Sequence, residues 1–276
     1  MGRPRRMPAK EAIISAASLC VVAALPGCSA SGSAAGSSAA GSLAPATIHS
    51  AAHSSGAAHS AKAAFAFTVA GDRPVLPSGS QDTHAQTPNT TCDSATFAAD
   101  KALGARLARA FGLAGLPVSA DLLAHFLAGT GTGVNYRAGS PMAKKALASE
   151  AFRALNAEVQ KTILRQLKAG RTRVRLSAAQ LPAVAFESTS SDLYWGFRGT
   201  QGLTVTGRGA RENGRYAGTL SYVIRDSYGF PVGDTLDGFG PPMRYLQTVC
   251  GAPRHAGGAH WFPDSITVTV PFNRPA

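Results

Sequence analysis

The run from Asp192 to Phe230 constrains the fold of this chain more than any other segment. It is the densest aromatic and β-branched stretch of an alanine-rich sequence, and the turn compositions GTQG and RENG interrupt it. Glycine adopts positive φ without steric cost and asparagine tolerates it, so both breaks favour turns. The run therefore predicts three extended pieces, near 193–198, 202–208 and 215–225, joined as an antiparallel meander.

Alternation in the third piece predicts one buried face and one open face. Tyr216, Leu220 and Tyr222 share one parity and are expected to line one face together. Thr219 and Val223 have the opposite parity and are expected on the other face.

Helical patterns precede these strands. Apolar residues about four apart predict helices over about 94–111, 119–128 and 142–169, and the segment MRYLQTVC predicts a short helix that ends at Cys250. The stretch 260–272 alternates as a last strand. Because helices come first and strands follow, the sequence predicts a single α+β domain, with N-terminal helices followed by an antiparallel β-meander.

The first 27 residues have the pattern of a secretory signal peptide, with a basic start and an apolar core over 12–25. The segment Leu25-Pro26-Gly27-Cys28 resembles a bacterial lipobox. That resemblance implies that Cys28 carries a diacylglycerol, with fatty acids such as palmitate, and becomes the mature N-terminus. The expected location is the outer face of the cell membrane. An ordinary cleaved signal of a secreted protein is the alternative.

The segment 28–62 is almost entirely alanine, serine, glycine and histidine, so it cannot bury enough apolar surface to fold. It predicts a flexible tether, which as a random coil of about 35 residues would span roughly 30–35 Å. Residues 63–91 predict an arm on the domain or further linker, and 92–276 predict the α+β domain itself.

Two cysteines remain once the signal peptide is removed and Cys28 is lipidated. Outside the cytoplasm, Cys92 and Cys250 are expected to form a disulfide. The chain-entropy model assigns a loop of this length about 4–5 kcal/mol. Two separate buried thiols are the alternative.

The net charge limits the partners. The chain carries +12, and removal of residues 1–27 leaves 23 basic and 14 acidic residues, a net charge of +9. Such a surface suits anionic lipid headgroups, an acidic cell-wall polymer or nucleic acid, and export makes nucleic acid the least suitable. A charge that only aids solubility is the alternative.

Asp226 is the leading candidate for chemistry, because it lies where a strand gives way to a loop and the chain has few acids. Arg225 would favour its ionised form, and the phenol of Tyr228 is two residues away. Together they could ligate a divalent metal, orient a water or bind a headgroup. The loop residues that could converge on Asp226 are Asp234, Asp237, His255 and His260. A turn-capping Asp226 with Tyr228 packed over it is the alternative.

From about Leu123 onward the chain resembles the activity domain of colicin M-type bacteriocins. The shared features are a helix ending in LAHFLAGTG, a helical middle, a β-meander, a strand end of the form Asp-x-Tyr-x-Phe, a helix and a last strand. Asp226, Tyr228 and Phe230 match that strand end. The family's motif has a second Asp where this chain has Gly229, an Asn where it has Pro231, and a following His-Arg that is missing here.

The resemblance implies a metal-dependent hydrolase of the phosphodiesterase or pyrophosphatase type, which cleaves lipid II outside the membrane with a divalent cation such as Mg²⁺. Asp226 would be the central carboxylate, with Asp234, Asp237 or His255 in the missing roles. Arginines near it would meet the phosphates; these are Arg225, Arg244 and Arg254. The alternative is a non-catalytic lipoprotein that uses the same fold to bind an envelope component or protein.

Overall fold

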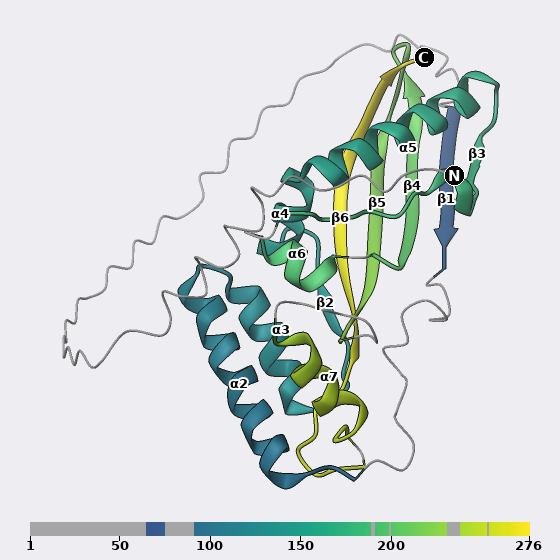
Figure 1. The fold of residues 1–276 in the computed structure, drawn as a ribbon. Helices are drawn as coiled ribbons and strands as arrows, with labels where there is room; N and C mark the ends of the chain where they lie inside the picture. The colour runs from purple at the N-terminus through teal and green to yellow at the C-terminus, as the bar shows by residue number, and fades with distance from the viewer. Residues whose placement is uncertain (1–64, 75–90, 189–190, 199, 231–237, 253) are drawn as a thin grey trace, which may run out of the picture. The chain divides into compact units, whose positions relative to one another are not determined.

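A six-stranded mixed sheet forms the centre of the described chain (Figure 1). This computed structural model describes residues 65–74, 91–188, 191–198, 200–230, 238–252 and 254–276, all of them within a single compact unit that spans Ala61–Ala276. The predictions for the signal peptide, Cys28 and the tether lie outside the described residues. Within the described part, no helix combines the length and the hydropathy needed to cross a membrane.

The strand order in the sheet is β2-β6-β5-β4-β1-β3. The central strands β1, β4, β5 and β6 pair antiparallel, whereas β3 joins β1 and β2 joins β6 in parallel at the two edges. The strands are β1 Phe65–Arg73, β2 Val134–Tyr136, β3 Arg173–Leu176, β4 Gly202–Glu212, β5 Arg215–Tyr228 and β6 Phe262–Pro275. The segment expected as an arm or linker therefore supplies an inner strand.

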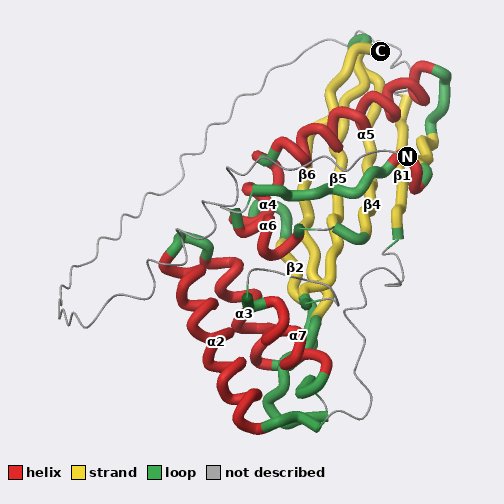
Figure 2. The backbone as a smooth tube through the Cα atoms, in the orientation of Figure 1, coloured by secondary structure: helices red, strands yellow, loops and turns green. Residues whose placement is uncertain are grey.

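The α+β fold class is confirmed, and the helices occupy two places around the sheet (Figure 2). Of these, α4 and α5 lie along one face of the sheet, and α2, α3 and α7 gather towards one end. The helices are α2 Ser94–Leu113, α3 Pro117–Ala128, α4 Pro141–Ala148, α5 Glu150–Lys168, a 3₁₀ turn Ala178–Gln180, α6 Asp192–Phe197 and α7 Gly240–Thr248.

The β4–β5 hairpin follows from its turn residues. The two-residue loop is Asn213-Gly214, and both residues have positive φ, 49° and 71°. This conformation matches the twist of the paired strands, and Asn-Gly is the dipeptide that adopts it most readily. The turn predicted at RENG is therefore confirmed.

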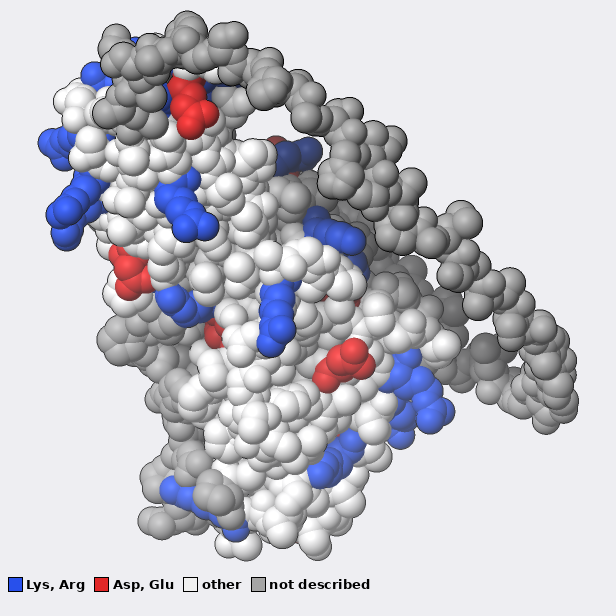
Figure 3. Space-filling view, turned by 180° about the vertical axis from the view of Figure 1, so that it is seen from behind, with Lys and Arg blue, Asp and Glu red and all other residues white. Residues whose placement is uncertain are grey.

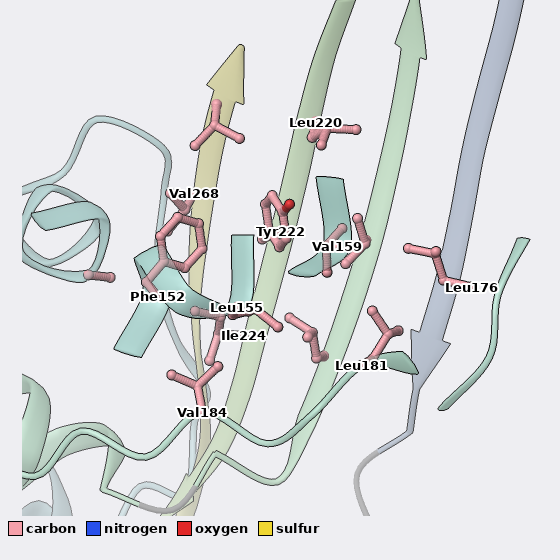
Figure 4. Close-up of a cluster of buried hydrophobic side chains, with 14 of the residues drawn as sticks. Phe152, Leu155, Val159, Leu176, Leu181, Val184, Leu220, Tyr222, Ile224 and Val268 are labelled. Atoms are coloured by element: carbon pink, nitrogen blue, oxygen red, sulfur yellow. The ribbon is translucent and has the colours of Figure 1, made fainter. Parts of the chain in front are cut away.

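Alternation in β5 produces the main core. Tyr216, Leu220 and Tyr222 are all buried on one face, as predicted, and α5 covers them. Figure 4 shows Tyr222 beside Phe152 and Leu155 of α5. The rings of Phe152 and Tyr222 meet edge to face with centroids 5.1 Å apart. Burial of these side chains contributes most of the driving force for docking α5 on the sheet.

Two sequence predictions about local structure are wrong. The piece 193–198 is not a strand, because Asp192–Phe197 forms α6, with the Ser191 side chain accepting a hydrogen bond from the Leu193 amide. The long helix predicted over 142–169 is two helices, α4 and α5. Ser149 is extended (φ −70°, ψ 148°) and its Oγ caps α5, so it breaks the helical run. Of the three pieces predicted for the meander, only β4 and β5 are strands; β1 and β6 flank them in the antiparallel group, and α7 intervenes before β6.

A second core lies where α2, α3 and α7 meet the strand ends. It includes Phe126 from α3, Met243 from α7 and Phe262 from β6. The Sγ atoms of Cys92 and Cys250, which flank α2 and α7, lie 1.99 Å apart, at disulfide distance. This helical group therefore surrounds the end of β5, where Asp226 lies.

Candidate functional site

Two acids face each other across the β5–β6 ladder. Asp226 and Asp264 are directly opposite partners in the antiparallel register. Opposite residues of such a pair have Cα atoms about 4.5–5.5 Å apart and project to the same face of the sheet. Both residues are buried, with exposed fractions of 9% and 3%. Two carboxyl groups therefore share one enclosed position in the protein interior.

The sequence places them there by alternation. Asp226 follows Tyr222 and Ile224 on the buried parity of β5, and Asp264 lies between Phe262 and Ile266 on the buried parity of β6. An acid at such a position is drawn inward with its apolar neighbours, because a shift of one residue would expose the whole apolar face. The fold therefore imposes the burial of both carboxyls.

The burial of the Asp264 carboxyl is energetically unfavourable and is compensated only in small part. Neither of its carboxyl oxygens has a hydrogen-bond partner among the described residues. Burial, and then the neighbouring carboxyl of Asp226, raise the pKa of Asp264 well above its usual range, and its own backbone N–H offsets this only in part. Asp226 accepts a hydrogen bond from the Ser227 amide at 2.9 Å. We therefore expect one proton to be retained on the pair at neutral pH.

Two tyrosines adjoin the pair. Tyr228 lies two residues after Asp226 on the same face of β5. Its ring stacks on that of Phe262, with ring centroids 5.2 Å apart. Burial and the charge of Asp264 raise the pKa of Tyr228, and the same two causes raise that of Tyr136 on β2. Both phenols therefore stay protonated and can act as hydrogen-bond donors.

A further buried acid, Asp192, differs from Asp264 because both of its carboxyl oxygens have partners. Its Oδ1 accepts hydrogen bonds from the backbone amide and the hydroxyl of Ser119, each at 2.8 Å. Its Oδ2 forms an ion pair with Lys145, whose side chain is 41% exposed. Asp192 thereby fastens α6 to the first turn of α3 and to α4. A structural role accounts for all of these contacts.

Of the other predicted site residues that the structure describes, Arg225 and His255 contact residues other than Asp226. Arg225 projects to the opposite face of the sheet, where its guanidinium meets Thr204 at 2.6 Å and Asp72 at 3.5 Å. His255 packs on Phe97 of α2, with ring centroids 4.5 Å apart.

Of the remaining arginines, Arg244 is half-buried on α7 and Arg254 is exposed in the following loop. His260 has its Nδ1 beside the carbonyl of Trp261. Asp234 and Asp237 lie outside the described residues. Tyr228 is the predicted partner that the structure does bring close to Asp226.

Asp264 and Tyr136 are not among the site residues predicted from the sequence. Asp264 had a detectable signal, because it is the only charged residue on the apolar parity from Phe262 to Phe272. No local pattern indicates Tyr136 as a site residue, because its strand β2 has only three residues. Its position is set by parallel pairing with β6, which is distant in sequence.

His125 also lies near this end of the sheet. Its ring meets Phe262 edge-on at 4.5 Å, and its Nε2 is 2.8 Å from the carbonyl oxygen of Thr132. The hydroxyls of Thr130 and Thr132 lie 3.3 and 3.2 Å from the same nitrogen. The loop of 129–133 therefore folds back onto His125 and holds it in place.

The described residues do not by themselves fit a divalent-cation site. Among them, no three His, Cys, Asp or Glu side chains are grouped so that they could hold a metal ion. The pair of Asp226 and Asp264 offers two carboxyls, fewer than the set of oxygen ligands that Mg²⁺ uses.

A cavity of about 780 Å³ lies elsewhere, between α4, α6 and the α2–α3 turn. Lys145, Glu187 and Phe186 are among its lining residues, and neither Asp226 nor Asp264 is. The chemistry of the buried groups points to the β5–β6 pair rather than to this cavity.

No family model, no curated protein and no solved structure matches this chain. The resemblance to colicin M-type activity domains stays a prediction.

Proposed function

We propose that this chain is an exported, lipid-anchored envelope protein whose α+β domain hydrolyses a lipid-linked pyrophosphate such as lipid II. The carboxyls of Asp226 and Asp264 form its acid–base centre. The observation that carries the proposal is the enclosed pair itself, in which Asp264 lacks any hydrogen-bond partner among the described residues. A carboxyl whose pKa is raised by burial beside a second acid is typical of general acid–base sites.

The surroundings of Gly229 support a rearranged version of the family site. A side chain at this position would begin 2.9 Å from Oε1 of Gln247 and 3.1 Å from Cβ of Trp261. The same Gln247 oxygen accepts a hydrogen bond from the Phe230 amide at 3.0 Å. The position of the family's second acid is therefore filled, and Asp264 supplies the second carboxyl from β6 instead.

The two carboxyls take complementary roles. Asp226, the more exposed of the pair, accepts a proton from a water that attacks phosphorus. Asp264, which retains its proton because of burial, donates it to the oxygen that leaves as the phosphorus–oxygen bond breaks. One water is consumed: its oxygen bonds to phosphorus and one of its protons ends on Asp226, while the proton of Asp264 ends on the leaving oxygen. The phenols of Tyr136 and Tyr228 can stabilise charge on the phosphoryl oxygens by donating hydrogen bonds.

The expected cellular location supports this class of substrate. The signal peptide, the lipobox at Cys28 and the tether would hold the domain near the membrane surface where lipid-linked precursors lie. Partners would accordingly be the membrane and a lipid-linked precursor.

Hydrolysis of lipid II and of undecaprenyl pyrophosphate is the test. The fragment from Ala61 carries every described element and both cores, and its folding can be checked by circular dichroism. We expect turnover to fall at least about 100-fold in Asp226→Asn and in Asp264→Asn. Asp72→Asn is the matched control, because it removes an acid from the opposite face of the sheet.

The assay is run with Mg²⁺ and again with a chelator. Equal turnover in the two aspartate variants and the control would contradict the proposal. So would a folded wild-type fragment that hydrolyses neither substrate under conditions in which a colicin M-type enzyme does.

A non-catalytic envelope-binding protein is the second candidate. The observation that favours it is that Arg225 and His255, which would be expected to contact substrate, bind Asp72 and Phe97 instead. Under this reading, the fragment retains an envelope ligand with unchanged affinity in Asp226→Asn while no substrate is hydrolysed.

A further inference from the structure

The face of the sheet opposite α5 has a distinct composition. On this face the strands present alternate residues, about two thirds of them threonine, serine, alanine or arginine, and most are exposed. Seen from behind, this side of the molecule carries scattered Lys and Arg with fewer acids among them (Figure 3). We refer to it as the open face.

Three guanidiniums frame one area of the open face. In the pairing register, Thr68 of β1 lies between Arg173 of β3 and Arg208 of β4. Neighbouring strands are about 4.8 Å apart, so the Cα atoms of the two arginines are separated by roughly 10 Å. Arg175 lies two residues along β3 from Arg173, about 6.6 Å away. These three arginines form a triangle around small side chains.

The arginine triangle has no internal counterion. All three residues are exposed, and within the described part of the chain none of them takes part in an ion pair. Two acids of the described strands share this face: Asp72 is engaged by Arg225 and by the hydroxyl of Thr204, and Glu212 lies opposite Arg215 beside the hairpin turn. The positive charge of the triangle is therefore available to an external anion.

A hydroxyl array continues from the triangle. Thr206 of β4, Ser221 of β5 and Thr269 of β6 lie in one row across three strands. Thr204 and Thr267 lie in the adjoining row, on either side of Val223. The three hydroxyls of the first row recur at the strand spacing of about 4.8 Å, and each can donate and accept a hydrogen bond. The hydroxyl of Thr204 is already engaged by Asp72 and Arg225.

We propose that the open face binds a linear anionic polysaccharide, with its acidic groups on Arg173, Arg175 and Arg208 and its hydroxyls along the threonine and serine rows. Guanidinium suits sulfate, phosphate and carboxylate because it donates two parallel hydrogen bonds. This interaction goes beyond the proposed hydrolysis and does not depend on it, because Asp226 and Asp264 project to the other face.

The chemistry favours a polysaccharide over a bilayer. A lipid surface would be attracted by charge alone and would leave the hydroxyl rows without a partner. No described residue of the open face is aromatic, and Val223 is its largest apolar side chain. Such a face has nothing to insert between lipid headgroups.

Binding of heparin to the fragment from Ala61, measured by calorimetry, tests the proposal, with neutral dextran as the reference polymer. The variant Arg173→Gln, Arg175→Gln, Arg208→Gln should lose about tenfold or more in affinity, since three exposed charge contacts are removed. The matched control removes the same charge from the exposed face of α5, by the changes Arg153→Gln, Arg165→Gln and Lys168→Gln. It should lose less than about twofold.

A second variant examines the hydroxyl row without changing the charge. Thr206→Val with Thr269→Val should weaken heparin binding about threefold, because two hydrogen bonds to the polymer are lost. Equal losses in the arginine variant and the α5 control would show that net charge alone attracts heparin and would overturn the proposal. Tighter binding to phosphatidylglycerol vesicles than to heparin, lost in the arginine variant, would also overturn it in favour of a membrane.

Discussion

Two buried acidic sites in this domain solve the same electrostatic problem in opposite ways. At Asp192 the carboxylate is fully enclosed, yet it has Ser119 on one oxygen and Lys145 on the other. At the β5–β6 pair, Asp264 is almost as enclosed and its oxygens have no hydrogen-bond partner among the described residues. Tyr136 lies within electrostatic reach of both sites.

The difference separates a structural role from a functional one. A buried charge that is paired and hydrogen-bonded fixes the positions of its neighbours, and removing it is costly. A buried carboxyl left without partners lowers the stability of the fold, and such costs concentrate at functional sites. Substitutions at the two sites should therefore change stability in opposite directions.

The largest expected effect is that of Asp192→Ala. It leaves the buried amide and hydroxyl of Ser119 without an acceptor and releases Lys145, so the free energy of unfolding should fall by about 3–5 kcal/mol. Urea denaturation monitored by circular dichroism measures this. A loss below about 1 kcal/mol would remove the contrast between the sites.

Asp264→Asn should instead raise the free energy of unfolding. The folded state holds a proton on Asp264 at pH values where the unfolded chain, with a pKa near 3.9, has released it. Stability therefore falls as pH rises above about 4, and the cost is complete above the raised pKa. The variant lacks this cost, so at pH 7–8 it should be about 1–2 kcal/mol more stable than wild type.

Thermal unfolding at several pH values checks this prediction. The advantage of Asp264→Asn should shrink towards pH 4, and about 1 kcal/mol corresponds to roughly 2–4 °C in Tm for a domain of this size. A variant that is less stable at every pH would show that the Asp264 carboxyl is satisfied in the folded protein.

Lys145→Met should have a smaller effect than Asp192→Ala. The ammonium is partly exposed, so solvent screens its attraction to Asp192, and both Ser119 hydrogen bonds remain. A loss of about 1 kcal/mol is expected in urea denaturation. A loss as large as that of Asp192→Ala would mean that the ion pair, rather than Ser119, holds α6 in place.

The smallest change in stability is expected for Tyr136→Phe. This substitution keeps the ring packed on Phe197, at 6.0 Å, and removes only the hydroxyl. The free energy of unfolding should change by less than about 0.5 kcal/mol, while hydrolysis of lipid II should slow if the phenol donates to substrate. Unchanged turnover would exclude Tyr136 from the site.

Sequence reasoning reached the features that depend on local pattern. The Asn213-Gly214 turn and the buried parity of β5 follow from spacing and turn chemistry. It missed the helix at Asp192–Phe197, because the contacts of Asp192 with Ser119 and Lys145 are made across long sequence separations.

For the site, sequence reasoning selected Asp226 and Tyr228 but not their partner. Asp226 and Asp264 meet only because β5 and β6 pair in one register, which no local pattern specifies. Arg225 was placed beside Asp226 by adjacency in sequence, yet successive strand residues project to opposite faces. The alternation that identified the core thus also separates these two side chains.

The most direct test of the central claim is a titration of the Asp264 carboxyl by NMR, with the Asp264→Asn variant used to assign its signal. The account predicts that Asp264 remains protonated at neutral pH and releases its proton only well above the usual range of an aspartic acid. A single titration near pH 4, with Asp226 titrating independently, would contradict it, because the two carboxyls would then be ordinary solvated acids and no acid–base pair would exist.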